Sequence, residues 1–181
     1  MGVSKRQFMM LALCSAFVTT ASAHGPSRLK VELSIDIAAP ADKVWARIGN
    51  FQDMSWHPAV ASSTGSGGNN AEATRVLVLK GEGTPTIEEA LRRHDAAAMS
   101  YAYKITKVDP VVLPVTNYAS TLSVESAGEG KSRVHWKGAF YRGYPNNDPP
   151  PEQNDDAAIK AVTGVYQGGL DALKAAMEKG G

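Results

Sequence analysis

Apolar and polar residues alternate along most of the chain between residues 30 and 141. In residues 30–37 the alternation is strict, with aliphatic residues on one side and charged or polar residues on the other. A period of two is typical of a strand with one buried face. Further stretches with this pattern or with a short apolar run are residues 60–64, 72–80, 86–94, 99–106, 117–125 and 133–141. We therefore predict an antiparallel sheet of about seven strands.

Residues 38–60 show helical spacing instead. Pro40 and Asp42 favour a first helical turn, because this turn leaves its N–H groups unused and an acid there suits the helix dipole. Three apolar residues then fall on one face, and Gly49 ends the segment. A second apolar segment closes at residues 56–58, Trp-His-Pro, since the residue before proline is pushed out of helical geometry. Two short helices after the first strand are predicted.

From about Asp156 onward, apolar residues recur at steps of three and four, which predicts one long C-terminal helix. Gly168 and Gly169 lie inside it, and each glycine costs about 1 kcal/mol relative to alanine. We expect a close approach to the sheet, or room for a ligand, at this point. The predicted fold class is α+β: a helix-grip fold in which a curved antiparallel sheet wraps on the C-terminal helix and encloses a cavity.

Strand parity selects candidates for the cavity wall. Within residues 86–94, Glu89 shares a face with Ile87 and Leu91, and the same parity puts Arg93 there. A carboxylate in this setting is either an edge-strand charge or a polar group inside a cavity. Tyrosines on apolar faces give an apolar wall with polar tips. The candidate ligand-binding residues are Glu89, Tyr101, Tyr103, Tyr118, Ser120, Trp136 and His57.

Two of these candidates have a second interpretation. Trp136 fits a position in the core as well as one in the cavity wall. His57 fits the cavity mouth, or a structural hydrogen bond to a neighbouring loop. No pair of a nucleophile and a base stands out, so no catalytic residue is predicted.

Two loops are also of interest. Residues 110–114 interrupt the strand pattern and are predicted to form a gate-like loop. Residues 142–156 are rich in proline and acids and have no apolar periodicity. Loops of this length in compact domains are often functional. The second loop is therefore a candidate for a partner contact, with a solvated spacer as the alternative.

The first 23 residues have the features of a secretory signal peptide. Lys5 and Arg6 precede an apolar run over residues 8–18, and Ala-Ser-Ala follows at residues 21–23. The run is too short to span a bilayer. We predict cleavage after Ala23 and a periplasmic location.

Composition fits one domain over residues 30–181, preceded by a short extension over residues 24–29. Without Lys5 and Arg6 the 19 basic residues fall to 17, against 18 acidic ones, so charge gives no case for nucleic-acid binding. The one cysteine, Cys14, lies in the signal segment, which excludes disulfides and cysteine metal sites from the mature chain.

We expect neither a metal nor a cofactor. The four histidines include no HExxH motif. The alternative is a copper site at His24: after cleavage, the new terminal amine and the imidazole of this residue would form a chelate suited to copper.

The chain resembles the START/Bet v 1-like (SRPBCC) superfamily, in its polyketide cyclase/dehydrase-like branch. The resemblance covers residues 30 to 178 and rests on Ala39-Pro40 with Val44-Trp45, Phe51 with Trp56-His57-Pro58, Ile87-x-Glu89-x-Leu91 with Asp95, Ser100-Tyr101-x-Tyr103, Leu113-Pro114-Val115-x-Asn117-Tyr118, and Arg133-Val134-x-Trp136. In ligand-binding relatives the equivalents of Glu89, Tyr101, Tyr103, Tyr118 and Ser120 line the pocket.

A closer likeness is to the MxaD-type periplasmic accessory proteins of methanol oxidation. It rests on the export signal, the loop YPNNDPPPEQND and the helix AAIKAVTGVYQGGLDALK. This resemblance implies a non-catalytic protein that assists a quinoprotein alcohol dehydrogenase or its cytochrome c. The alternative is a polyketide cyclase-like enzyme, with Glu89 as general base, or a carrier of small hydrophobic ligands that uses Glu89 and the pocket tyrosines.

Overall fold

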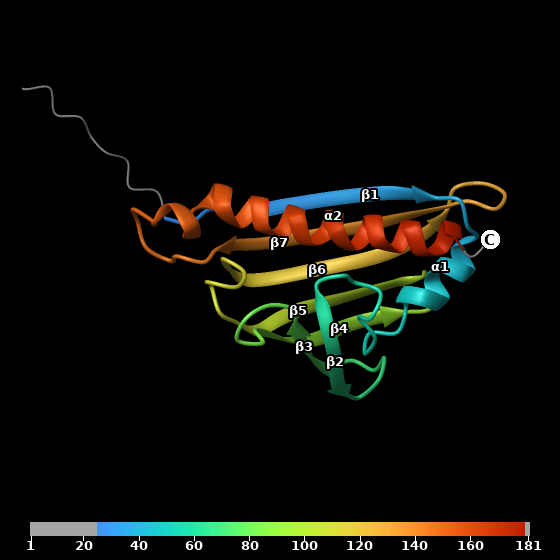
Figure 1. Cartoon of the computed structure of the whole chain (residues 1–181), viewed down its shortest axis with the longest axis horizontal. Helices are drawn as coiled ribbons and strands as arrows, with labels where there is room; N and C mark the ends of the chain where they lie inside the picture. The colour runs from blue at the N-terminus through green and yellow to red at the C-terminus, as the bar shows by residue number, and fades with distance from the viewer. Residues whose placement is uncertain (1–24, 180–181) are drawn as a thin grey trace, which may run out of the picture.

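A computed structural model gives the fold and describes residues 25–179. One seven-stranded antiparallel sheet has the order β1-β7-β6-β5-β4-β3-β2 (Figure 1). Its strands are β1 (Leu29–Ile37), β2 (Val60–Ser66), β3 (Thr74–Leu79), β4 (Thr86–Asp95), β5 (Ser100–Val108), β6 (Val115–Ser126) and β7 (Ser132–Arg142). The helices are α1 (Ala41–Ile48), the single 3-10 turn η1 (Pro151–Gln153) and α2 (Asp155–Lys179). The predicted signal peptide and His24 lie outside the described residues.

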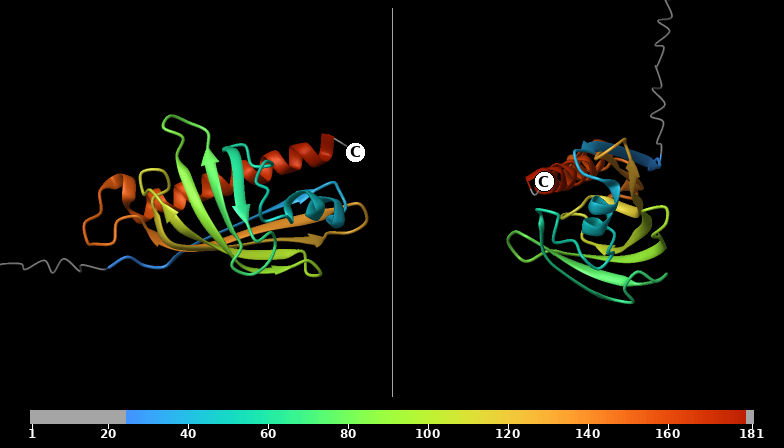
Figure 2. Two further views of the ribbon diagram at one scale, coloured as in Figure 1. Left: turned by 90° about the horizontal axis from the view of Figure 1, so that it is seen from below. Right: turned by 90° about the vertical axis from the view of Figure 1, so that its right-hand side faces the viewer.

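The sheet is curved, and α2 lies along its concave side (Figure 2). The helix packs chiefly on β1 and β7, so it covers one half of the concavity. In the other half, formed by β2 to β5, the segment of residues 49–59 that follows α1 and the loop of residues 109–114 contribute side chains to the inner side. This arrangement confirms the predicted α+β helix-grip fold.

The strands form where the alternation predicts them. In β1 the aliphatic residues are buried or half-buried and the polar ones are exposed, and Leu33 pairs with Trp136 of β7. In β7 each buried residue from Ser132 to Arg142 alternates with a more exposed one. A strand with one face on the core and the other in water has this pattern.

The prediction of a second short helix after β1 is wrong. α1 ends at Ile48, and residues 49–59 form turns. Side chains satisfy the backbone donors that a helix would have used: Asn69 Oδ1 accepts from Phe51 N, and Asp53 Oδ1 accepts from Ser55 N. Short polar side chains of this kind compete with helical hydrogen bonding, which explains the difference.

The predicted inward position of Arg93 is also wrong. A β-bulge lies between Leu91 and Arg93, where β4 carries one residue more than β5. The extra residue reverses the parity of the strand beyond it. Arg93 is therefore 75% exposed, and His94 faces Tyr101 in its place.

α2 comes unusually close to the sheet at two glycines. A Cβ on Gly138 of β7 would collide with the Tyr166 hydroxyl, and a Cβ on Gly169 of α2 would lie 2.6 Å from His57 Cδ2. At this point the rings of Trp136 and Tyr166 are stacked with centroids 4.4 Å apart. The close approach expected at Gly168-Gly169 is therefore found at Gly169, whereas Gly168 faces open space.

Within residues 25–179, none of the helices combines the length and the apolar character needed to cross a membrane.

The two adjacent glycines of α2 give a matched stability test. Gly169→Ala should lower the free energy of unfolding by about 1–3 kcal/mol, because the added methyl group has no room beside His57 and Trp136. Gly168→Ala should raise it by up to about 1 kcal/mol through helix propensity alone. Urea unfolding of both variants measures the difference. Equal effects would contradict the close packing at Gly169.

Candidate functional site

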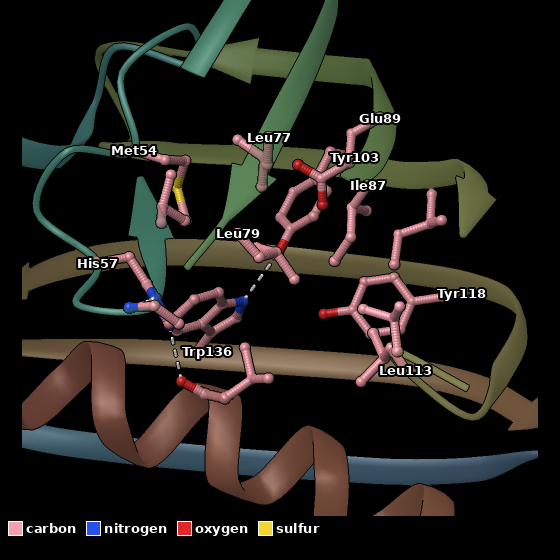
Figure 3. Close-up of a pocket in the computed structure, with 15 residues that line it drawn as sticks. Met54, His57, Leu77, Leu79, Ile87, Glu89, Tyr103, Leu113, Tyr118 and Trp136 are labelled. Carbon is pink, nitrogen blue, oxygen red and sulfur yellow. Dashed lines mark hydrogen bonds between the residues drawn. The ribbon is translucent and has the colours of Figure 1, made fainter. Parts of the chain in front are cut away.

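A small cavity lies between the two halves of the sheet, beneath α2 (Figure 3). Its volume of about 90 Å³ corresponds to roughly three water molecules at ~30 Å³ each. The wall is mostly apolar. It is formed by Met54, His57, Ala59, Val60, Leu77, Leu79, Ile87, Glu89, Tyr103, Ile105, Val112, Leu113, Tyr118, Trp136 and Val165.

Five of the seven predicted ligand-binding side chains meet at this cavity: His57, Glu89, Tyr103, Tyr118 and Trp136. The other two lie outside its wall. Tyr101 is buried beside Phe51, with ring centroids 6.0 Å apart. Ser120 is buried in a hydrogen-bond network behind the wall. Strand parity identified the correct face for both but could not tell which part of a long face borders the cavity.

The buried partner of Glu89 is Arg75 of β3. Arg75 Nε donates to Glu89 Oε2 at 2.6 Å, and both side chains are almost inaccessible, at 1% and 5% exposure. The guanidinium also donates to the carbonyl oxygen of Phe51 and lies over the Phe51 ring, 4.2 Å from its centroid. Arg75 was not predicted, because the continuous apolar run after it hid which face of β3 is buried. Arg75 and Glu89 are opposite each other on the neighbouring strands β3 and β4, and this pairing of opposite charges could have indicated that Arg75 is buried beside Glu89.

Charge in this pair is balanced. Burial raises the pKa of the Glu89 carboxyl group above its ordinary value, and the positive charge of Arg75 opposes the rise. Burial lowers the pKa of Arg75, but the Glu89 carboxylate more than offsets this, so the guanidinium keeps its proton. The pair thus places a neutral but strongly dipolar unit at one end of the cavity.

Hydroxyl groups form a directed chain at the other end. Ser120 Oγ donates to the carbonyl oxygen of Lys137 at 2.8 Å, which uses its only proton. Tyr166 therefore donates to Ser120 Oγ at 2.9 Å, and Tyr118 donates to Tyr166 at 2.6 Å. The Trp136 indole N–H is shared between Ser120 Oγ at 3.0 Å and the Tyr103 hydroxyl oxygen at 3.1 Å.

The three tyrosines of this hydrogen-bond network, Tyr103, Tyr118 and Tyr166, stay protonated over the physiological pH range. Burial raises the pKa of Tyr103 and of Tyr118 well above the ordinary value of 10, and the nearby Glu89 adds to the rise for Tyr103. Burial raises the pKa of Tyr166 to about 12. Each is therefore a neutral hydrogen-bonding group.

His57 joins the cavity wall to α2. Its Nδ1 accepts from Ala59 N at 3.2 Å, so the proton is assigned to Nε2, which donates to the carbonyl oxygen of Val165 at 3.0 Å. Burial lowers the pKa of His57, and the positive charge of Arg75 lowers it further. His57 thus lines the cavity and also makes structural hydrogen bonds, to the Val165 carbonyl of α2 and to Ala59 of its own turn.

The proline-rich loop after β7 is anchored by Arg142, a buried residue that was not predicted. Its guanidinium donates to the carbonyl oxygens of Tyr144 at 2.9 Å and Asn146 at 2.8 Å, and it pairs with Asp155 Oδ1 at 3.2 Å. Both loop carbonyls and the start of α2 are therefore held by one side chain. The acidic residues Asp148 and Glu152 remain exposed.

Among residues 25–179 there is no group of three or more histidine, cysteine, aspartate or glutamate side chains arranged to hold a metal ion. His135 lies outside the cavity and contacts Glu125 at 3.0 Å, while His94 contacts the carbonyl oxygen of Gly49 at 2.8 Å.

A curved sheet closed by a single long helix around an apolar cavity defines a helix-grip protein. The chain belongs to the family described as "Polyketide cyclase / dehydrase and lipid transport", which it matches over residues 28–178. The expected relation to the START/Bet v 1-like superfamily is thereby confirmed. Comparison with curated proteins gives no match.

Solved structures from bacteria share the fold. An uncharacterized protein from Bacillus thuringiensis is 31% identical, with a TM-score of 0.68, and the match covers 82% of this chain and 98% of that one. The protein XoxI from Bacillus cereus is 30% identical, with a TM-score of 0.68 and coverage of 82% and 94%. A protein from Thermobifida fusca is 30% identical, with a TM-score of 0.64 and coverage of 80% and 90%.

Burial of His57 predicts a specific pH dependence of stability. Because the folded-state pKa lies below the ordinary value of 6.5, the unfolded chain binds more protons in the window beneath that value. Stability should therefore fall as the pH drops below about 6.5, and His57→Gln should remove this part of the slope. Urea unfolding between pH 7.5 and 5 measures it. Parallel curves for the two proteins would show that His57 is not the titrating group.

The Arg75–Glu89 pair predicts strong non-additivity. Glu89→Gln should cost about 3–5 kcal/mol, because it leaves a buried guanidinium without its counter-charge. Arg75→Met should cost a similar amount for the opposite reason. The double variant Arg75→Met with Glu89→Leu should cost clearly less than the sum of the single changes, as measured by urea unfolding. Additive losses would contradict the ion pair.

Proposed function

We propose that this protein is an exported, non-catalytic binding protein of the periplasm that uses its internal cavity and its proline-rich loop to assist a quinoprotein alcohol dehydrogenase or its cytochrome c. The cavity carries the binding part of the proposal, because five side chains from distant parts of the chain converge on one mostly apolar space. The dehydrogenase and cytochrome partners, and the export, come from the resemblance to MxaD-type proteins.

The state of the cavity groups favours binding over catalysis. An acid-base mechanism needs a group that is free to exchange its proton with a substrate. Among the described residues of the cavity wall, Glu89 is the one carboxyl group, and it is in an ion pair with Arg75. Both ring nitrogens of His57 are engaged by the backbone. No nucleophile adjoins either residue within the described wall.

The exposed loop of residues 143–154 supports the contact with a partner. Its ends are fixed by Arg142, so Asp148 and Glu152 are presented on a segment that is held in place. Acidic groups displayed in this way favour a partner with a basic surface, through attraction that is screened by salt.

Ligand binding can be tested at Tyr118. Native mass spectrometry of the protein from the periplasm of its host should show a small-molecule adduct, and Tyr118→Ala should reduce its occupancy because the cavity wall is lost. Tyr141→Ala is the matched control, since this tyrosine does not line the cavity. An adduct of equal occupancy in all three proteins would place the ligand elsewhere.

Partner binding can be tested at the loop. Asp148→Asn with Glu152→Gln should weaken association with the dehydrogenase or cytochrome by about three- to tenfold at low ionic strength, and less at high salt. Glu129→Gln, in the turn at the opposite end of β7, is the control and should have no effect. Surface plasmon resonance measures both. Unchanged affinity of the loop variant would exclude this loop as the electrostatic contact.

A further inference from the structure

Two hydrogen-bonding groups of the cavity have unused capacity. The Tyr103 hydroxyl accepts from Trp136 Nε1, but its own proton has no acceptor within residues 25–179. Glu89 Oε2 is taken by Arg75, while Glu89 Oε1 has no donor within the same residues. Polar groups that line an apolar cavity are normally paired, so an unused donor and an unused acceptor on the wall of one cavity indicate a molecule that pairs with both.

These two groups face the same space. Figure 3 shows the Glu89 carboxyl group and the Tyr103 hydroxyl directed toward the interior of the cavity, with aliphatic side chains such as Leu77 and Ile87 around them. The other polar groups of the wall have assigned roles. The Tyr118 hydroxyl donates to Tyr166, and both ring nitrogens of His57 are hydrogen-bonded to the backbone.

Charge and size narrow the chemistry of the ligand. Arg75 already neutralises Glu89, so a charged ligand would add an unpaired charge to a buried site. A volume of about 90 Å³ admits a molecule of only a few non-hydrogen atoms. The ligand must also supply a hydrogen-bond donor for Glu89 and an acceptor for Tyr103.

We propose that the cavity binds a small neutral molecule with an aliphatic hydroxyl group. The oxygen of this hydroxyl accepts a hydrogen bond from Tyr103, and its O–H donates a hydrogen bond to Glu89 Oε1. This inference rests on the proposed function, since it assumes that the cavity holds a ligand. A ketone of the same shape satisfies Tyr103 but leaves Glu89 Oε1 unpaired. An ammonium ion satisfies Glu89 but leaves Tyr103 unpaired and brings a second positive charge close to Arg75.

Three probes of nearly equal shape separate these cases: 2-propanol, acetone and isopropylammonium. Two side-chain N–H signals report on the two ends of the site in a proton–nitrogen NMR titration. Trp136 Nε1–H is bonded to the Tyr103 oxygen, and Arg75 Nε–H is bonded to Glu89. 2-Propanol should shift both signals and bind about tenfold more tightly than the other two probes, because each of these leaves one buried group unpaired. Acetone should shift the Trp136 signal alone.

Tyr103→Phe tests the donor without removing the ring. Ser120 Oγ still accepts from Trp136 Nε1 in this variant, so the fold should be kept. Its affinity for 2-propanol should fall by about tenfold. Tyr141→Phe is the matched control: this tyrosine does not line the cavity, so the affinity should change less than about twofold.

The outcomes distinguish the two levels of the proposal. Preference for 2-propanol that is lost in Tyr103→Phe supports the hydroxyl-bearing ligand. Equal binding of all three probes, with shifts at cavity residues, would overturn this ligand class while the cavity remained a binding site. Absence of any shift at cavity residues up to molar probe concentration would overturn both the ligand class and the proposed use of the cavity.

Discussion

The structure depends on one contact, where the stacked rings of Trp136 and Tyr166 join α2 to the sheet. Gly138 makes this contact possible, because any side chain there would occupy the space of the Tyr166 hydroxyl. Gly169 does the same from the helix side. With α2 held this close to β7, the half of the concavity beneath β1 and β7 is filled. The remaining space is displaced toward β3, β4 and β5, and there it forms the cavity.

The polar groups around this cavity are costly to bury, and the structure offsets that cost in two ways. At one end Arg75 and Glu89 neutralise each other, and the guanidinium gains further contacts with the Phe51 carbonyl and ring. At the other end the hydroxyl groups form a chain of hydrogen bonds: Tyr118 donates to Tyr166, Tyr166 donates to Ser120, and Ser120 donates to a backbone carbonyl. These hydrogen bonds fix the polar side chains of the wall, and only a few of their atoms remain free to bond a ligand.

Most of the fold could be predicted from the sequence, because period-two alternation and helical spacing report directly on which face is buried. The errors arose where a local feature interrupts the period. The bulge after Leu91 reverses strand parity, and the Asn50 to Ser55 region replaces a helix with side-chain-bonded turns. For the candidate site, parity placed Glu89, Tyr103 and Tyr118 on the face that borders the cavity. It missed Arg75 and Arg142, because each is buried through a partner on another element, Glu89 of β4 and Asp155 of α2.

The cavity and the proline-rich loop are parts of one continuous structure. Leu113 lines the cavity, and the next residue, Pro114, packs against Gly143 at the start of the loop, so closely that a Cβ on Gly143 would lie 3.0 Å from its backbone. Arg142, the preceding residue, holds the loop carbonyls and the first turn of α2. Leu113, Pro114 and Gly143 therefore connect the cavity wall directly to the segment that presents Asp148 and Glu152.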